Sequence, residues 1–341
     1  MKKFLFLVFF AAAFAFAASP KVIGYFPSWA QYSQFAPADV RYGFLSDIRY
    51  CCLVPSGSEL LFADESDKAN FIELVKLSKV NKVRIFVSVG GMGNETAMLD
   101  VSAANFGRAA KDFAKEYGID GFELDGGAVD LDGAKKIAEL AGSLANSGLA
   151  VSIAIQGEAS FAQAIPASIA SKLDAVSLWF TDQMSASESV VKPNSNTSEN
   201  LKILAAFAGT GIPKEKLIAI VPLYGKSFEG AKSLGSSFKG IGSGNEGILQ
   251  YKGLMDKFKN ANAYKVSLDS ASQSEVAVNE YEIIVFNGIP SMQAMASAVK
   301  SNGYGGVAVF DVSGDHKEPI ISLLVSIGQI LRPDVNYKKK K

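Results

Sequence analysis

The 341-residue sequence contains only one histidine, His316, and only two cysteines, the adjacent residues Cys51 and Cys52. A Ser-His-Asp triad would have to use His316, and no G-x-S-x-G motif is present to supply its serine. One histidine and two neighbouring cysteines also lack the ligand spacing of a zinc site. We interpret His316 as a loop residue, because it follows Asp315 after the last predicted strand. The sequence therefore predicts no metal site and no cofactor.

The two cysteines lie in a strand-like apolar run from Ile48 to Leu53. Disulfides are common in exported proteins, but a disulfide between sequence neighbours is strained. A buried free cysteine, in contrast, packs as a small hydrophobic residue. We therefore expect two buried free thiols rather than a Cys51–Cys52 disulfide.

The sequence also lacks an excess of charge of either sign. Thirty-four basic residues balance thirty-four acidic ones, so electrostatics gives no reason to expect nucleic acid or an anionic membrane surface as a partner. Residues 336–341 are the local exception, and we interpret this lysine-rich end as a solvated basic tail. Hydrophobic residues make up 48% of the chain and charged residues 20%, a composition that can bury a large core.

The N-terminus has the pattern of a secretory signal peptide. Lys2 and Lys3 precede an apolar stretch from Phe4 to Phe16, which is too short to span a bilayer. Ala15-Phe16-Ala17 is a small-x-small cleavage site, so residues 1–17 are predicted to be removed. An uncleaved anchor is the alternative. We expect a secreted, periplasmic or cell-surface protein with no membrane span after cleavage.

After residue 17, strand-like apolar runs alternate with helix-like stretches, which is typical of βα units around a parallel sheet. A doubly wound open sheet is the alternative, but no Gly-rich phosphate loop follows the first run. There are eight strand-like runs, the number that a closed (β/α)8 barrel over residues 18–335 needs. The runs are Val22–Tyr25, Ile48–Leu53, Arg84–Val87, Gly121–Leu124, Ala150–Ile155, Ala175–Phe180, Leu217–Leu223 and Gly306–Val309.

The connection between the seventh and eighth runs is much longer than the others. Residues 228–287 contain Gly- and Ser-rich stretches, followed by a segment, 281–286, that alternates like a strand. We predict a small α+β insertion here, followed by a barrel helix at about residues 291–301.

Acidic residues follow one of the apolar runs at the end of the barrel where active sites lie. The fourth run reads Asp120-Gly121-Phe122-Glu123-Leu124-Asp125-Gly126-Gly127. Strand alternation directs Glu123, Asp125 and position 127 into the barrel. Inward carboxylates are costly unless they share protons and hydrogen bonds, so packing alone does not explain this pattern.

This segment resembles the D-x-x-D-x-D-x-E motif of glycoside hydrolase family 18, the chitinase family. Asp120 and Asp125 match the motif, and Glu123 stands where its middle aspartate belongs. Ser88-Val89-Gly90-Gly91 resembles the S-x-G-G of the family's third strand. Residues 24–29, 216–228 and 305–311 resemble its first, seventh and eighth strands, and the long connection resembles its chitinase insertion domain. The resemblance implies a chitinase-like barrel for glycans that contain N-acetylglucosamine.

The resemblance also reveals departures from the family pattern. The family's general acid is the glutamate that ends the fourth-strand motif, and Gly127 occupies this position. In the sixth run Trp179 replaces a methionine, Thr181 replaces the tyrosine that bonds the substrate's N-acetyl carbonyl, and Asp182 is retained. Phe310 replaces the tryptophan of the eighth strand. The motif Asp120, Glu123, Asp125 and Gly127 is thus interpreted as the remnant of a catalytic site.

Another acid would have to replace the missing glutamate for hydrolysis to continue. Asp125 lies roughly 6.5 Å below position 127, and Glu123 lies roughly 13 Å below it at 3.3 Å per residue. Asp130 and Asp132 on the following loop are further candidates. General acid catalysis tolerates little misplacement, so we expect no hydrolysis.

Aromatic residues near the predicted strand ends could still stack on sugar rings. The candidate substrate-binding residues are Tyr25, Trp29, Asp125, Trp179, Asp182, Tyr224 and Phe310. The leading hypothesis is an exported, non-catalytic protein that binds chitin-type or peptidoglycan-type glycans. An active chitinase or endo-N-acetylglucosaminidase with a displaced acid is one alternative. A scaffold that binds a protein partner through the barrel surface and the insertion is the other.

Overall fold

The computed structural model describes residues 19–56, 59–181, 189–260 and 264–334. The predicted signal peptide and basic tail lie outside these residues. None of the described helices is long and apolar enough to cross a membrane.

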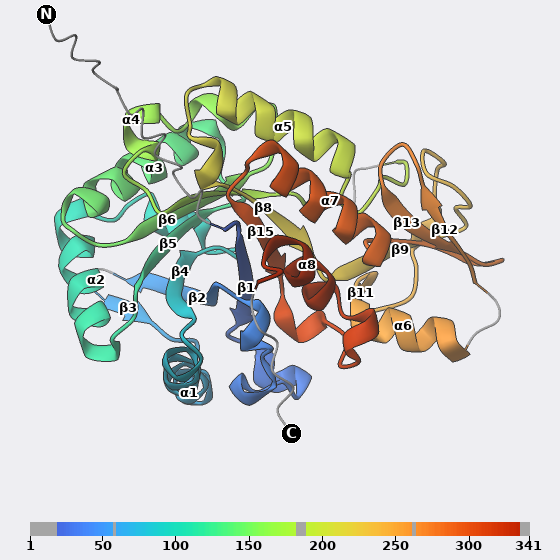
Figure 1. Cartoon of the computed structure of the whole chain (residues 1–341), viewed down its shortest axis with the longest axis horizontal. Coiled ribbons are helices and arrows are strands. Elements are labelled where there is room, and N and C mark those ends of the chain that lie inside the picture. Colours follow the sequence, from blue (N-terminus) through green and yellow to red (C-terminus); the bar gives the residue numbers. More distant parts are fainter. Residues whose placement is uncertain (1–18, 57–58, 182–188, 261–263, 335–341) are drawn as a thin grey trace, which may run out of the picture.

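Eight parallel strands close into a barrel, in the order β1-β15-β8-β7-β6-β5-β4-β2, and β2 returns to pair with β1 (Figure 1). Each predicted run overlaps one of these strands, so the predicted (β/α)8 barrel is confirmed and the doubly wound alternative is wrong. The strands are β1 (Lys21–Pro27), β2 (Asp47–Ser56), β4 (Arg84–Gly90), β5 (Gly121–Gly126), β6 (Val151–Gln156), β7 (Ala175–Trp179), β8 (Leu217–Pro222) and β15 (Gly306–Phe310).

Helices surround the barrel, and a large apolar core fills the space between helices and strands. The barrel helix predicted at about residues 291–301 corresponds to α7 (Ile289–Asn302). The short strand β3 (Glu59–Leu61) pairs antiparallel with the end of β2. The outer helices are α1 (Glu65–Asn81), α2 (Ala103–Tyr117), α3 (Leu131–Asn146), α4 (Ala167–Ala170), α5 (Thr197–Gly209), α7 (Ile289–Asn302) and α8 (Leu323–Leu331).

The connection between β8 and β15 forms a second, antiparallel sheet beside the barrel, as predicted for an insertion between the seventh and eighth strands (Figure 1). This sheet begins at Tyr224, ahead of the predicted boundary at 228, because β9 follows β8 after a single residue. Its elements are β9 (Tyr224–Glu229), β10 (Gly240–Ile241), β11 (Ile248–Gln250), α6 (Tyr251–Asn260), β12 (Lys265–Asp269), β13 (Ser274–Val278) and β14 (Glu282–Phe286).

Candidate active site

A buried ion pair lies inside the barrel. Arg49 on β2 bonds to Glu123 on β5, and neither side chain is exposed to solvent. Glu123 also accepts hydrogen bonds from the Tyr25 hydroxyl at 2.5 Å and from the Ser177 hydroxyl at 3.3 Å. Burial raises the pKa of the Glu123 carboxyl, and the Arg49 charge opposes this shift. The polar contacts explain how this inward carboxylate is tolerated.

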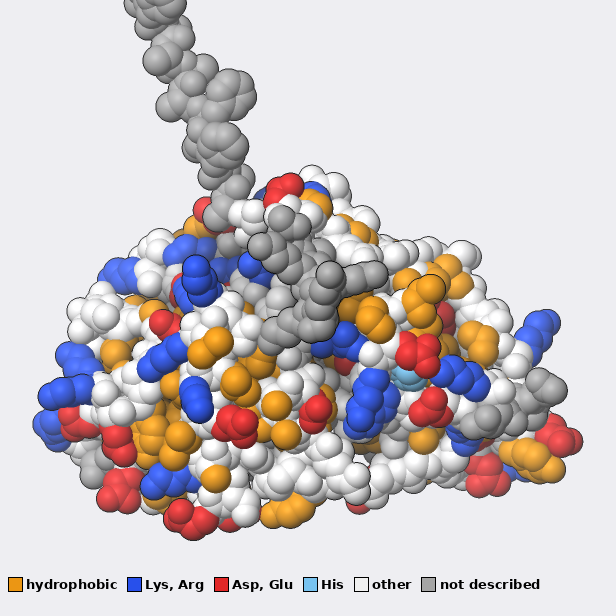
Figure 2. Space-filling view, turned by 60° about the horizontal axis from the view of Figure 1, so that its bottom comes forward, with side chains coloured by type: hydrophobic (Ala, Val, Ile, Leu, Met, Phe, Trp, Pro, Cys, Tyr) orange, Lys and Arg blue, Asp and Glu red, His pale blue; other side chains and the backbone are white. Residues whose placement is uncertain are grey.

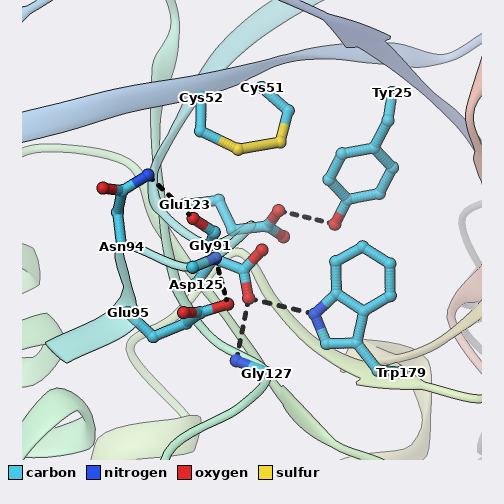
Figure 3. The surroundings of a disulfide bond; sticks show 11 residues. Tyr25, Cys51, Cys52, Gly91, Asn94, Glu95, Glu123, Asp125, Gly127 and Trp179 are labelled. Atoms are coloured by element: carbon cyan, nitrogen blue, oxygen red, sulfur yellow. Dashed lines mark hydrogen bonds between the residues drawn. A yellow bond between two sulfur atoms is a disulfide. The ribbon is translucent and has the colours of Figure 1, made fainter. Parts of the chain in front are cut away.

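Asp125 lies one inward position further along β5 and is 1% exposed. Its Oδ1 atom accepts one hydrogen bond from the Trp179 indole Nε1 at 3.0 Å and another from the Gly127 backbone N–H at 2.9 Å (Figure 3). Burial, reinforced by the nearby charge of Glu123, raises the pKa of Asp125 to about 7. Near neutral pH this carboxyl group therefore exists in both protonation states.

The side chain of Trp179 fills the space beside Gly127. A Cβ atom built on Gly127 would lie 2.7 Å from both Cδ1 and Nε1 of the indole. Real Cβ atoms do not approach other heavy atoms this closely. Position 127 therefore accepts a side chain only if Trp179 moves.

Aromatic rings cover the acidic residues at the mouth of the barrel. Trp179 lies 5.0 Å from Phe310 and 5.6 Å from Tyr25, measured between ring centroids. Trp179 is 9% and Phe310 7% exposed, whereas Trp29 and Tyr224 are half-buried and pack against this inner cluster. Trp179 and Phe310 are thus buried, and the half-buried rings of Trp29 and Tyr224 present the accessible aromatic surface.

Cys51 and Cys52 form a disulfide at the same end of the barrel (Figure 3). The prediction of two free thiols is therefore wrong. The register between β2 and β4 shifts between Cys51 and Leu53, so the strict alternation that separates neighbouring side chains is interrupted at this point. The burial that the sequence predicted is present, because Cys51 is 0% and Cys52 8% exposed.

The other predicted acids have different surroundings. Asp120 accepts a hydrogen bond from the Ile85 N–H at 2.7 Å, which ties the start of β5 to β4. Asp130 caps α3 by accepting from the Gly133 N–H at 2.8 Å, and Asp132 pairs with Lys135 at 2.9 Å. Asp182 lies outside the described residues. The structure thus brings Glu123 and Asp125 together and leaves Asp120, Asp130 and Asp132 in local structural contacts.

Sequence reasoning missed two charged residues at this site. Arg49 is the buried partner of Glu123, and it could have been found as a lone charge in an apolar run, two residues before Cys51. Glu95, 9% exposed, contributes to the raised pKa of Asp125. Its position after the third strand gave no periodic signal. Among the residues that the structure describes, no group of three or more His, Cys, Asp or Glu could hold a metal ion.

The fold and the site together define a (β/α)8 barrel with an α+β insertion and with inward carboxylates on the strand that leads to the mouth. The family model of the glycosyl hydrolases family 18 matches residues 21–315. The chain belongs to this family, and its fold is chitinase-like.

The similar proteins of known sequence are mostly chitinases. Endochitinase 1 of Metarhizium robertsii is 24% identical over 93% of this chain and 88% of that protein. Mouse chitotriosidase-1 is 24% identical over 85% of this chain and 72% of that protein.

Solved structures show the same fold. The Group IV chitinase of Ostrinia furnacalis superposes with a TM-score of 0.83 at 20% identity, covering 92% of this chain and 99% of that one. Human YKL-39 has a TM-score of 0.81 at 18% identity, covering 92% and 100%.

Proposed function

We propose that this protein is an exported, chitinase-like glycan-binding protein that does not hydrolyse its ligand. The observation that carries the proposal is the contact between Gly127 and Trp179. Gly127 stands at the position of the family's general acid, and a Cβ there would lie 2.7 Å from the indole. The acid is absent and its space is occupied, so protonation of a glycosidic oxygen from this position is not available.

The half-buried aromatic residues support glycan binding. Trp29 and Tyr224 pack beside Trp179 and Phe310, and such rings can stack on the apolar faces of sugars. Human YKL-39 is described as a pseudo-chitinase with retained chitooligosaccharide binding, which shows that this fold can bind without hydrolysis. Glycans containing N-acetylglucosamine are therefore the proposed ligands. The N-terminal signal-like sequence supports export.

One observation favours a second candidate, an active hydrolase in which Asp125 is the displaced acid. A pKa near 7 suits a general acid at neutral pH. The carboxyl group is 1% exposed beneath Trp179, so this candidate requires Trp179 to move away in the complex. It predicts turnover that Asp125→Asn abolishes and that falls as pH rises through about 7, because the carboxyl group must be protonated to act as the acid.

Hydrolysis of fluorogenic chitobioside and chitotrioside tests the missing acid. We expect no turnover by the wild type or by Gly127→Glu alone, because Trp179 obstructs the new side chain. The double variant Gly127→Glu/Trp179→Met provides both an acid and space, so we expect at least roughly tenfold more turnover than background. Gly127→Gln/Trp179→Met is the matched control, with the same shape and no acid. Turnover by the wild type would show that the protein is an enzyme.

Calorimetric titration with chito-oligosaccharides and peptidoglycan fragments tests binding. Trp29→Ala removes one accessible ring, and the loss of about 0.5–1.5 kcal/mol of stacking corresponds to an affinity up to roughly tenfold weaker. Tyr281→Ala is the control, because Tyr281 is 68% exposed in the turn between β13 and β14, next to the end of β9 opposite Tyr224. The absence of heat with every ligand would remove the support for a glycan-binding role.

A further inference from the structure

The insertion sheet has one open edge. Its strand order is β10-β9-β14-β13-β12, so β12 has β13 on one side and no strand on the other among the described residues (Figure 1). The opposite edge, β10, is only two residues long. Four of the five residues of β12 are exposed. An open edge of this length presents unpaired backbone donors and acceptors to another strand.

The side chains of β12 are apolar on one face and charged on the other. Val266 is 48% and Leu268 44% exposed, and the alternation of a strand places both on the same face. Lys265, Ser267 and Asp269 lie on the opposite face, with opposite charges at the two ends. The sequence Lys-Val-Ser-Leu-Asp is therefore complementary to itself when a second copy runs antiparallel.

We propose that β12 is a self-association site, at which two copies of this chain pair their β12 strands antiparallel about a two-fold axis at Ser267. In this register Lys265 of each copy lies opposite Asp269 of the other, and Val266 lies opposite Leu268. Each pairing places opposite charges or two apolar side chains across the strands, and such pairs stabilise a sheet. The two-fold symmetry is that of most soluble dimers.

The charges favour a second copy in this orientation over a parallel one. Parallel pairing in register would place Lys265 beside Lys265 and Asp269 beside Asp269, which is destabilising. Lys265 makes no ion pair within the part of the chain that the structure describes. Asp269 is held in place by hydrogen bonds from the Ser272 N–H at 2.8 Å and hydroxyl at 2.6 Å. Both charged groups remain available to a partner strand.

The association is expected to be weak. A five-residue strand spans roughly 17 Å and supplies less than the roughly 1,200 Å² of a standard specific interface. We expect a dimer that dissociates at roughly tens to hundreds of micromolar. The inference does not depend on glycan binding, and its tests contain no glycan.

Sedimentation velocity over a concentration series tests the dimer. We expect the wild type to shift from monomer to dimer, and Lys265→Glu to weaken the dimer by roughly tenfold, because it faces Asp269 with a like charge. The charge-swapped double variant Lys265→Glu/Asp269→Lys should regain association. Ile320→Lys is the matched control, since Ile320 is 82% exposed and lies on the barrel side of the chain. A wild type that stays monomeric at about 1 mM, or a Lys265→Glu variant that associates like the wild type, would overturn the proposal.

Single cysteine variants test the register. Two copies of Ser267→Cys would lie directly opposite each other, at Cβ distances of about 4.5–5.5 Å, and we expect rapid disulfide-linked dimers under mild oxidation. Two copies of Lys265→Cys would lie roughly 13 Å apart at 3.3 Å per residue, beyond disulfide reach. Equal cross-linking of the two variants would overturn the proposed register. This outcome does not depend on which glycan the protein binds.

Discussion

The protonation of the buried Asp125 carboxyl group affects the free energy of unfolding of the whole protein. Its pKa is about 7 in the folded protein, compared with the ordinary value of 3.8 for an aspartate side chain. Between these two values the folded protein holds a proton that the unfolded chain has lost, so the free energy of unfolding falls as pH rises. The loss amounts to at most roughly 1.4 kcal/mol per pH unit, and it ends above about pH 7.

We predict that Asp125→Asn removes this pH dependence. Asparagine keeps an oxygen that can accept from Trp179 and Gly127, and it carries no charge at any pH. The variant should therefore exceed the wild type in stability at pH 8 and match it more closely at pH 4.5. Urea denaturation at both pH values measures the difference. Asp132→Asn is the control, because the Asp132 carboxylate is fully exposed. If the stability of Asp125→Asn changed with pH as steeply as that of the wild type, the pKa of Asp125 would not be raised in the folded protein.

Among the secondary-structure elements, one contact fastens the insertion to the barrel. Glu275 on β13 accepts hydrogen bonds from the Gly288 N–H at 2.6 Å and from the Ser291 N–H at 3.2 Å, at the start of α7. The Ser291 hydroxyl adds a third bond at 2.5 Å. The Glu275 carboxylate of the insertion sheet thereby caps the N-terminus of α7, a helix of the barrel. A helix N-terminus carries partial positive charge, so a negative charge there is stabilising.

We predict that Glu275→Ala lowers the free energy of unfolding by about 1–3 kcal/mol, since it leaves buried N–H groups without partners. The barrel should otherwise fold normally. Glu280→Ala is the matched control, because Glu280 is exposed in the turn after β13. Chemical denaturation of the two variants beside the wild type measures the difference, and equal stabilities would show that Glu275 does not fasten α7.

The elements could be predicted from the sequence to the extent that burial leaves a local pattern. The barrel strands are buried on both faces, so they read as apolar runs, and alternation alone placed Glu123 and Asp125 inside the barrel. The contact between Trp179 and Gly127 could not be predicted, because it joins separate strand ends and has no periodicity. The Cys51–Cys52 disulfide was missed because the register shift in β2 depends on its pairing with β4.

At the scale of the whole molecule, the balance of charge is visible on the surface. Figure 2 shows basic and acidic side chains interspersed over the face in view, with no face-wide region of one sign. This distribution agrees with the equal numbers of acidic and basic residues in the sequence. Recognition on this face therefore depends on local contacts and not on a long-range field.

The insertion and the barrel share one apolar core. Tyr251, Leu254, Ala277, Ile284 and Phe286 of the insertion belong to the same buried cluster as the residues between the barrel and its helices. With the Glu275 contact, this shared core ties the two sheets together. A chain of this length could otherwise unfold in separate steps.

We therefore predict that the insertion and the barrel unfold in one cooperative transition. The two tryptophans, Trp29 and Trp179, both belong to the barrel, so tryptophan fluorescence reports mainly on the barrel, whereas far-ultraviolet circular dichroism reports both sheets. The two signals should have the same midpoint in urea, and Glu275→Ala should move both midpoints together. A circular dichroism transition that precedes the fluorescence change would show that the insertion melts first and that the shared core does not couple it to the barrel.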